Sequence, residues 1–283
     1  MKYYRIKRGR GFSYIDAEGR SVQDEKLLSF FKSLVIPPAW TEVEINASPR
    51  AKVRATGYDA KERKQYIYNS NYRLRQEQKK FDRILQFANK LPHMRNITAQ
   101  HLRKRKLDQN KVLACMVRLL DVAFFRPGNE TYAKQNKSYG LTTLRSKHLK
   151  IDGDKLIFTY VGKAAQPQEK LIANAQLARI VREIGELPGY EIFKFIDEDG
   201  NIKDVKSQHL NAYIREIMGP EFSAKDFRTW AGTVIAAMSL DELGAIEEID
   251  QRKLNKNIRE AVIKVSERLG NTPAIARKSY IDP

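Results

Sequence analysis

The sequence has little of the chemistry on which disulfide-bonded and metal-dependent proteins depend. Among 283 residues there is one cysteine, Cys115, which cannot form a disulfide framework and suggests a reducing compartment. It lies in the apolar run VLACMVRLLDVAFF, so we interpret it as a core residue rather than a nucleophile. The few histidines are scattered and stand apart from carboxylate motifs, so we expect no metal site; they are His93, His101, His148 and His209.

Long hydrophobic runs are also missing. No stretch approaches the roughly 20 apolar residues that a membrane-spanning helix needs. The opening segment MKYYRIKRGRGFSYID is basic but has no apolar run after it, which argues against a secretory signal. We therefore expect a cytoplasmic protein with no membrane partner, and its composition of 42% hydrophobic and 30% charged residues favours folded globular domains.

Positive charge is abundant and unevenly distributed. The net charge is +18, and residues 1–90 carry 20 Lys and Arg against 10 Asp and Glu. Residues 91–150 carry 13 against 3, whereas residues 151–283 carry 19 against 21. An excess confined to the first 150 residues is more typical of a polyanion-binding face than of a general solubility charge, although a solvated basic surface is the simpler alternative.

Residues 1–90 have the pattern of a small β-rich domain. An alternating segment around a Gly-containing turn predicts a hairpin at the start, and a helix should end at Pro37-Pro38. Three short strands and a further helix follow: EVEINAS, AKVRATGYDA, RKQYIYN and RLRQEQKKFDRILQFANKL. LPHM after that helix resembles a linker, so we place a domain boundary near residue 91.

Residues 91–283 have a mainly helical pattern. The strongest helix, LDQNKVLACMVRLLDVAFF, should stop at Arg126-Pro127-Gly128. A hairpin turning at Asp152-Gly153 should carry Lys163 at its far end. Further helices are expected at the following places, with a surface hairpin after the first of them and a short final helix bearing Tyr280: 166–186, 206–218, 223–240 and 252–269. The predicted fold class is thus α+β, with a small β-rich domain and a mainly helical domain that contains a small antiparallel sheet.

Two arginines stand beside apolar helical residues rather than on polar faces. Arg126 directly follows Phe124-Phe125, and Arg228 lies between Phe227 and Trp230. A planar guanidinium held against a core is suited to bridging phosphate oxygens. Either arginine alone is more often an ordinary ion-pair partner, so the signal becomes specific only in its wider context.

That context is a series of segments in a fixed order. Residues 124 onward contain FFRPGNETYAKQNKSYGLTTLRSKHL, then FTYVGK, then KDFRTWAGT, and finally LGNTPAIARKSYI. Together they closely resemble the type IB DNA topoisomerases, particularly the short bacterial and poxvirus-type members. The segment ATGYDAKERKQYIY resembles the DNA clamp of the same family, so the resemblance covers nearly the whole chain.

The resemblance implies a role for each matching residue. Tyr280 would be the nucleophile that becomes linked to a DNA 3′ phosphate, and Lys163 would be the general acid for the departing 5′ oxygen. Arg126 and Arg228 would hold the nonbridging phosphate oxygens. Asn271 takes the place of a histidine found in many relatives, and an amide can orient the phosphate without adding charge. A second departure is Pro127, where relatives more often have a β-branched residue.

Elementary chemistry agrees with these implied roles. A phenol has a pKa near 10, so a positive pocket would favour its attack. The alkoxide leaving group needs a proton, which lysine can donate. A covalent intermediate conserves the bond energy, so resealing needs neither ATP nor a cofactor.

The clamp segment KERKQYIYN alternates basic and aromatic residues. On a strand this pattern places Lys64, Tyr66 and Tyr68 on one face, and Gln65 and Ile67 on the other. The alternative is an ordinary amphipathic strand with a tyrosine face. The residues that we expect to contact DNA, in most cases by resemblance, are Arg63, Lys64, Gln65, Tyr66, Tyr68 and Tyr132.

The resemblance predicts an enzyme that relaxes supercoiled double-stranded DNA by cutting one strand, letting it rotate and resealing it. We expect a monomer acting at the bacterial nucleoid. One rival is a tyrosine recombinase, but recombinases typically have His-x-x-Arg where this chain has Lys225 before Arg228, and they lack the clamp segment. Another is a non-catalytic DNA-binding protein of the same fold, which would not need all five catalytic positions.

Overall fold

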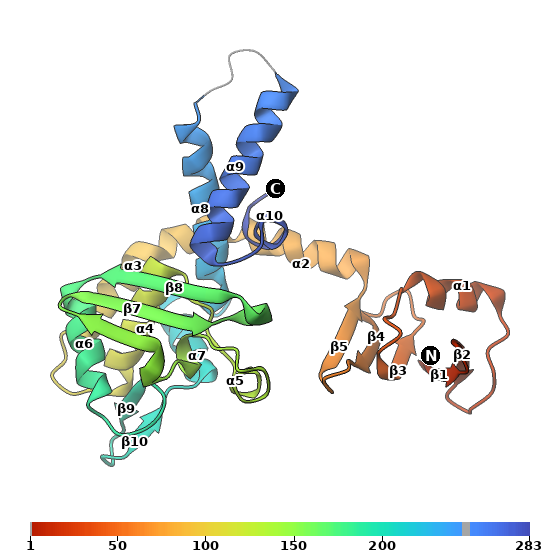
Figure 1. Cartoon of the computed structure of the whole chain (residues 1–283), viewed down its shortest axis with the longest axis horizontal. Helices are drawn as coiled ribbons and strands as arrows, with labels where there is room; N and C mark the ends of the chain where they lie inside the picture. Colours follow the sequence, from red (N-terminus) through yellow and green to blue (C-terminus); the bar gives the residue numbers. More distant parts are fainter. Residues whose placement is uncertain (1, 245–249) are drawn as a thin grey trace. The chain divides into compact units, whose positions relative to one another are not determined.

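The computed structural model describes residues 2–244 and 250–283 and divides the chain into two compact units. The first comprises Met1–Lys80 and the second Phe81–Pro283. Figure 1 shows a sheet with the helices α1 and α2 in the first unit, α2 running to the boundary, and a mainly helical second unit that contains a three-stranded sheet. The predicted α+β class is therefore confirmed.

The first unit is built on one antiparallel sheet with strand order β2-β1-β3-β4-β5. A tight turn at Gly9, whose φ is +53°, joins the first two strands in the predicted hairpin. The side chain of Asp24 caps the helix α1 by accepting from the backbone N–H groups of Lys26 and Leu27. The elements are β1 (Lys2–Arg8), β2 (Gly11–Asp16), α1 (Glu25–Ser33), β3 (Thr41–Asn46), β4 (Val53–Tyr58), β5 (Lys64–Tyr68) and α2 (Ser70–Asp82).

The core of the first unit is small and lies between one face of the sheet and α1. Phe31 of α1 is buried, and its ring centroid lies 5.1 Å from that of Tyr3 on β1. Val43, Ile45 and Ala55, which alternate along β3 and β4, complete the buried cluster. Strand period and helix position thus place the apolar side chains on a single face.

The other notable feature of this unit is an exposed row of aromatic rings. Tyr66 and Tyr68 alternate with inward-facing residues on β5 and stack with centroids 6.0 Å apart. Tyr72 of α2 continues the row 6.2 Å from Tyr68. The predicted division of β5 into a tyrosine face and a second face is confirmed.

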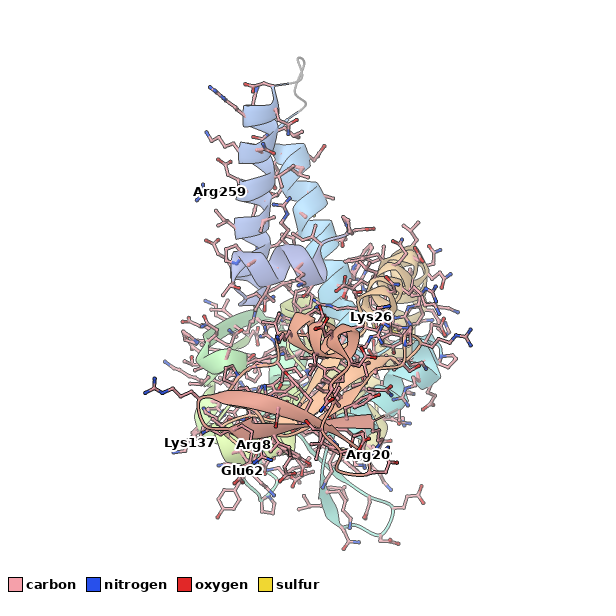
Figure 2. The ribbon with its side chains drawn as sticks, turned by 90° about the vertical axis from the view of Figure 1, so that its right-hand side faces the viewer. Arg8, Arg20, Lys26, Glu62, Lys137 and Arg259 are labelled. Atoms are coloured by element: carbon pink, nitrogen blue, oxygen red, sulfur yellow. The ribbon has the colours of Figure 1, made fainter. Side chains whose placement is uncertain are left out.

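Several positive side chains are exposed on the first unit. Arg8, Arg20 and Lys26 are exposed and drawn as sticks in Figure 2. Arg20 pairs with Asp16 at 2.8 Å, so part of this charge is locally neutralised. Exposed cations of this kind are the side chains that attract a polyanion.

The expected linker at residues 91–94 does not exist. These residues lie inside α3 (Ile84–Leu102), and the boundary between the compact units falls earlier, at Lys80/Phe81. Leu91 and Met94 are buried and continue the apolar face that begins at Phe87. Pro92 removes one helical hydrogen bond, but packing of this face keeps the segment helical.

The second unit is mainly helical, with the sheet β6-β7-β8 and the two-stranded ribbon β9-β10. The helices α8 and α9 form a long pair that projects from the rest of this unit (Figure 1). The further elements are α4 (Gln109–Ala123), α5 (Glu130–Asn136), β6 (Leu149–Asp152), β7 (Lys155–Val161), β8 (Pro167–Ala173), α6 (Ala175–Gly185), β9 (Lys194–Ile196), β10 (Ile202–Asp204), α7 (Ser207–Met218), α8 (Ala224–Glu242), α9 (Gln251–Leu269) and α10 (Pro273–Tyr280).

Helix α4 is the centre of the large core. Asp108 caps its N-terminus by accepting from the N–H of Lys111, and the helix contacts α3, α6 and α7. Cys115 is fully buried within it, and burial raises the pKa of its thiol to about 12. The interpretation of Cys115 as a core residue rather than a nucleophile is confirmed.

The expected helix over 166–186 is correct only in its second half. Residues Pro167–Ala173 form β8, which pairs along its whole length with β7, and α6 begins after the cap residue Asn174. Gln168 and Ile172 face inward with Lys170 between them, which is the alternation of a strand. The helical spacing of the apolar residues in the adjoining α6 led us to extend the predicted helix over this segment. Proline is tolerated at Pro167 because β8 is an edge strand.

Two glycines allow close backbone contact beyond the end of α4. The N–H groups of Leu141 and Thr142 donate to the carbonyl oxygens of Arg126 and Pro127, each at 2.8 Å. A Cβ on Gly140 would lie 2.6 Å from the backbone of Gly128. The motif SYGLTTL therefore supports the segment that carries Arg126.

None of the described helices is long and apolar enough to cross a bilayer. The described residues therefore include no candidate transmembrane helix.

We predict that Gly140→Ala lowers the free energy of unfolding by about 1–3 kcal/mol, because the added methyl group overlaps the Gly128 backbone. Thermal or urea unfolding measures the change. Gly185→Ala is the matched control, since no heavy atom lies within 4 Å of the added Cβ there. Equal stability of the two variants would contradict the close-contact account.

Candidate active site

Arg126 reaches the site because α4 ends abruptly. Phe124, the C-cap residue, has a left-handed backbone with φ 57°, and the buried Phe125 anchors the chain in the core. The Arg126 guanidinium then donates to the carbonyl oxygen of Gly270 at 3.4 and 3.5 Å and to the side-chain oxygen of Asn271. One predicted phosphate ligand is thus held against another.

Arg228 lies on the second turn of α8. Its side chain is only 2% exposed and donates to the backbone oxygens of Phe124 and Leu269, the latter at 2.8 Å. It therefore ties together the ends of α4 and α9. Its buried Nε has no hydrogen-bond partner among the described residues, and such a donor is normally satisfied by a ligand or water.

Asn271 lies in the turn between α9 and α10. Gly270 ends α9 with a left-handed backbone, and the N–H of Asn271 donates to the carbonyl of Ser266 at 2.9 Å. While its Oδ1 accepts from Arg126, its buried Nδ2 has no partner within the described residues. The turn thus leaves a second N–H donor group available close to the arginines.

Lys163 lies on an exposed loop after β7, at the far end of the predicted hairpin. The next two residues, Ala164 and Ala165, have φ values of 60° and 58°, so the loop turns sharply. The N–H of Gly162 donates to the carbonyl of Gln166 at 2.8 Å and closes it. The loop presents the lysine close enough for its charge to act on Tyr280.

Tyr280 is the last residue of α10, a helix started by Thr272 and Pro273. The guanidinium carbon of Arg228 lies 4.9 Å from the centroid of its ring. A Cβ on Gly232 would lie 2.3 Å from the Tyr280 carbonyl oxygen. The absence of a side chain at this position of α8 therefore lets the Tyr280 backbone pack directly against the helix. The Thr233 hydroxyl donates to this oxygen at 3.4 Å and accepts from the N–H of Asp282 at 3.1 Å.

The electrostatics of the site favour a phenolate. Burial alone would raise the pKa of Tyr280, but the charge and hydrogen bond of Arg228, followed by the charges of Arg126 and Lys163, lower it below its usual value. Burial, and then the charge of Arg126, lowers the pKa of Arg228 itself. The concentrated positive charge therefore favours the phenolate form of Tyr280 and disfavours the charged form of Arg228.

The structure adds two residues that sequence reasoning missed. Gln168, buried on β8, donates to the Gly270 carbonyl at 3.3 Å. Lys170 donates to the Arg268 carbonyl at 2.8 Å, and burial, with the charges of Arg228, Arg126 and Arg268, lowers its pKa to about 8. No motif marks either residue, and the only available signal was the period-two pattern of their strand.

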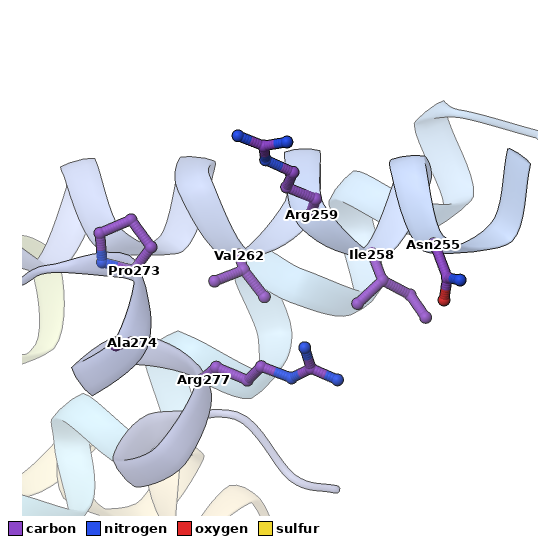
Figure 3. Close-up of a pocket in the computed structure, with 7 residues that line it drawn as sticks. All are labelled: Asn255, Ile258, Arg259, Val262, Pro273, Ala274 and Arg277. Atoms are coloured by element: carbon purple, nitrogen blue, oxygen red, sulfur yellow. The ribbon is translucent and has the colours of Figure 1, made fainter. Parts of the chain in front are cut away.

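A groove of about 400 Å³ lies elsewhere, between α9 and α10 (Figure 3). Its lining comprises Asn255, Ile258, Arg259, Val262, Pro273, Ala274 and Arg277. None of the five predicted catalytic residues is among them, so we locate the site by its charged groups rather than by concavity. Within residues 2–244 and 250–283, no three His, Cys, Asp or Glu side chains gather as metal ligands.

Comparison with known proteins gives the family. Residues 69–281 match "Eukaryotic DNA topoisomerase I, catalytic core", and residues 11–59 match "Bacterial DNA topoisomerase IB, N-terminal domain". The chain belongs to the type IB DNA topoisomerase family. The predicted family membership is confirmed, and with it the expectation of an enzyme, which by class is an isomerase.

Viral proteins are among the relatives of this type IB topoisomerase. DNA topoisomerase 1B of Acanthamoeba polyphaga mimivirus is 33% identical over 98% of this chain and 84% of its own length. DNA topoisomerase 1B of Vaccinia virus (strain Copenhagen) is 24% identical over 80% and 68%, respectively. A crystal structure of the XerH site-specific recombinase bound to difH substrate has a TM-score of 0.39 at 12% identity, covering 67% of this chain and 47% of that one, and we draw nothing from so weak a likeness.

The residues of this topoisomerase that we expect to contact DNA differ from one another in exposure and in the unit to which they belong. Arg63 and Gln65 both donate to the carboxylate of Asp59, at 2.6 and 2.9 Å, so they are held by the first unit itself. Lys64 is exposed on β5 with the two tyrosines of the aromatic row. Tyr132 belongs to the second unit, on α5, and is 51% exposed. Their contact with DNA stays a prediction.

We predict that the Tyr280 phenol of this topoisomerase ionises below pH 10, the ordinary phenol value being about 10, because nearby cations stabilise the phenolate. Ultraviolet difference titration of wild type against Tyr280→Phe isolates its signal. Arg228→Gln removes the nearest charge, so the same difference curve should move to higher pH. Tyr190→Phe removes an 82%-exposed tyrosine outside the site and calibrates the absorbance of one phenol. A Tyr280-dependent change centred above pH 10 would contradict the electrostatic account.

Proposed function

We propose that this topoisomerase relaxes supercoiled DNA by cutting one strand with Tyr280, allowing rotation about the intact strand, and resealing the cut. The observation that carries the proposal is the convergence on Tyr280 of the positive charges of Arg126, Lys163 and Arg228. Two buried donors there, Arg228 Nε and Asn271 Nδ2, have no partner in the described part of the chain. A phosphodiester would supply the missing acceptors and the missing negative charge.

In the first step the Tyr280 oxygen attacks phosphorus and its proton passes to solvent. The bond to the 5′ oxygen breaks, which leaves a 3′ phosphotyrosyl link and a free 5′ hydroxyl. The lowered pKa of Tyr280 favours this attack, because more phenolate character is available near neutral pH. The backbone and Cβ of Tyr280 pack against Gly232 and Thr233 of α8, so the point from which its side chain extends is fixed, which favours in-line attack.

Arg126, Arg228 and Asn271 stabilise the charge that develops on the nonbridging oxygens. Both guanidiniums are pinned by backbone carbonyls, so they need little reorganisation when the charge appears. The Asn271 amide contributes an N–H donor without a further positive charge. Phosphoryl transfer depends mainly on such positioning and electrostatic stabilisation.

Lys163 donates the proton that the leaving 5′ oxygen needs. Its loop leaves the side chain exposed while its charge still acts on Tyr280. A flexible side chain on a sharply turning loop suits an acid that must reach the far side of the phosphorus atom. In religation the same group would accept the proton back. The phosphotyrosyl bond retains the energy of the broken phosphodiester bond, so resealing needs no ATP.

The first unit would hold the duplex during the reaction through Arg63, Lys64, Gln65, Tyr66 and Tyr68, and the second through Tyr132. The ion pair with Asp59 fixes Arg63 in place, and the exposed tyrosine row offers hydroxyl donors and flat faces to the DNA backbone and groove. No ligand set in the sequence calls for a metal. Relaxation of supercoiled plasmid in EDTA without ATP tests the proposal as a whole.

We predict that Tyr280→Phe abolishes covalent attachment to DNA and plasmid relaxation, since only the attacking oxygen is lost. Binding to duplex DNA, measured by fluorescence anisotropy, should stay within about twofold, as expected for loss of one hydroxyl that is not a main DNA contact. Denaturing gel electrophoresis of a radiolabelled strand detects the adduct. An adduct formed by the Phe variant would identify another nucleophile.

We predict that Lys163→Ala slows cleavage by the roughly 10²–10⁴-fold typical of a lost general acid. Replacing the scissile 5′ oxygen by sulfur should remove this defect, because a thiolate leaves without a proton. The controls Arg126→Ala and Arg228→Ala should stay impaired on the sulfur substrate, since the nonbridging oxygens are unchanged. Equal impairment of Lys163→Ala on both substrates would make Lys163 an electrostatic ligand instead.

A further inference from the structure

Gln168 belongs to none of the segments that carry the family resemblance, yet its side chain lies within the site. It is 4% exposed on β8, where it pairs with Tyr160 of β7. Its Nε2 donates to the carbonyl oxygen of Pro167 at 2.9 Å and to that of Gly270 at 3.3 Å. The Gln168 side chain therefore links β8 to the end of α9 by a buried hydrogen bond.

The amide end of Gln168 supports the turn that carries Asn271. The Gly270 carbonyl that accepts from Gln168 also accepts from both terminal nitrogens of Arg126, at 3.4 and 3.5 Å. A Cβ on Gly270 would lie 2.1 Å from Gln168 Oε1, so the turn and the amide are in direct contact. The Gln168 amide and the Arg126 guanidinium therefore share one acceptor, the Gly270 carbonyl oxygen.

The aliphatic part of Gln168 supports a different loop. A Cβ on Gly162 would lie 2.9 Å from Gln168 Cγ, which means that the bare glycine rests on this methylene group. Gly162 directly precedes Lys163, and its N–H closes the loop by donating to the carbonyl of Gln166. One side chain thus touches both the loop of Lys163 and the turn of Asn271.

We propose that Gln168 is a positioning residue. It holds the Lys163 loop and the Arg126–Asn271 turn in the relative position that strand cleavage requires. This inference rests on the proposed function. Gln168 itself need not touch DNA: its amide acts on the phosphate ligands through Gly270, and its methylene groups act on the general acid through Gly162. The two parts of the side chain can be removed separately.

Gln168→Met keeps an unbranched chain against Gly162 but donates no hydrogen bond to Gly270. At saturating DNA, its cleavage rate constant should fall roughly 10-fold, the effect expected for one lost hydrogen bond. Gln168→Ala loses both contacts and should fall roughly 100-fold, as misplacement of reacting groups can cause. The exposed Gln166, on the same loop, provides the control Gln166→Ala, which should cleave like wild type.

The substrate with a 5′ sulfur leaving group separates the two contacts. The defect of Gln168→Met should persist on it, because the disturbed Arg126 still contacts the nonbridging oxygens. Gln168→Ala should recover by roughly 10-fold on it, since the part of its defect caused by Lys163 no longer matters. Duplex affinity should stay near wild type in both variants, and both should remain folded at the assay temperature even where the thermal midpoint falls.

Wild-type cleavage rates in both Gln168 variants would overturn the inference. So would rate losses fully accounted for by loss of folded protein, since Gln168 would then be an ordinary core residue. An unchanged sulfur-to-oxygen rate ratio in Gln168→Ala would overturn its link to Lys163. Failure of wild type to form a Tyr280 adduct would instead refute the proposed function, and that result is visible before any Gln168 variant is compared.

Discussion

The buried guanidinium of Arg228 is the contact on which the geometry of the site depends. It donates to the carbonyl of Phe124 at the end of α4 and to that of Leu269 at the end of α9, and it lies beside the ring of Tyr280. Three helices are therefore fixed relative to one another by a single charged group. Removing it would leave two buried carbonyls without their partners and the phenol without its nearest cation.

This arrangement leaves positive charge in excess when no phosphate is bound. Burial and Arg126 lower the pKa of Arg228, and burial with the same arginines lowers that of Lys170 to about 8. Basic groups whose pKa is depressed in the folded protein destabilise the fold while they remain charged at neutral pH, and a bound anion would reduce that cost. Under the proposed function, this like-charge repulsion in the free protein would be relieved when negative charge develops on the phosphate.

Sequence patterns failed where tertiary contacts outweigh local signals. Pro92 suggested a linker, yet burial of Leu91 and Met94 keeps α3 helical through it. The apolar spacing of α6 obscured β8, whose inward period is set by pairing with β7. Gln168 was missed for the same reason, since a glutamine on an unrecognised strand carries no chemical signal. Only the fold places it between Gly162 and Gly270.

The sequence by itself determined the family, the two-part α+β organisation and the identity of the candidate nucleophile, because these are written in local period, charge and motif order. It could not determine the boundary at Lys80/Phe81 or the close packing of the Tyr280 backbone against Gly232. It also gave no sign that Arg63 is held by Asp59. Those features depend on distances between residues that are remote along the chain or on side-chain geometry, and such distances exist only once the helices and strands have packed.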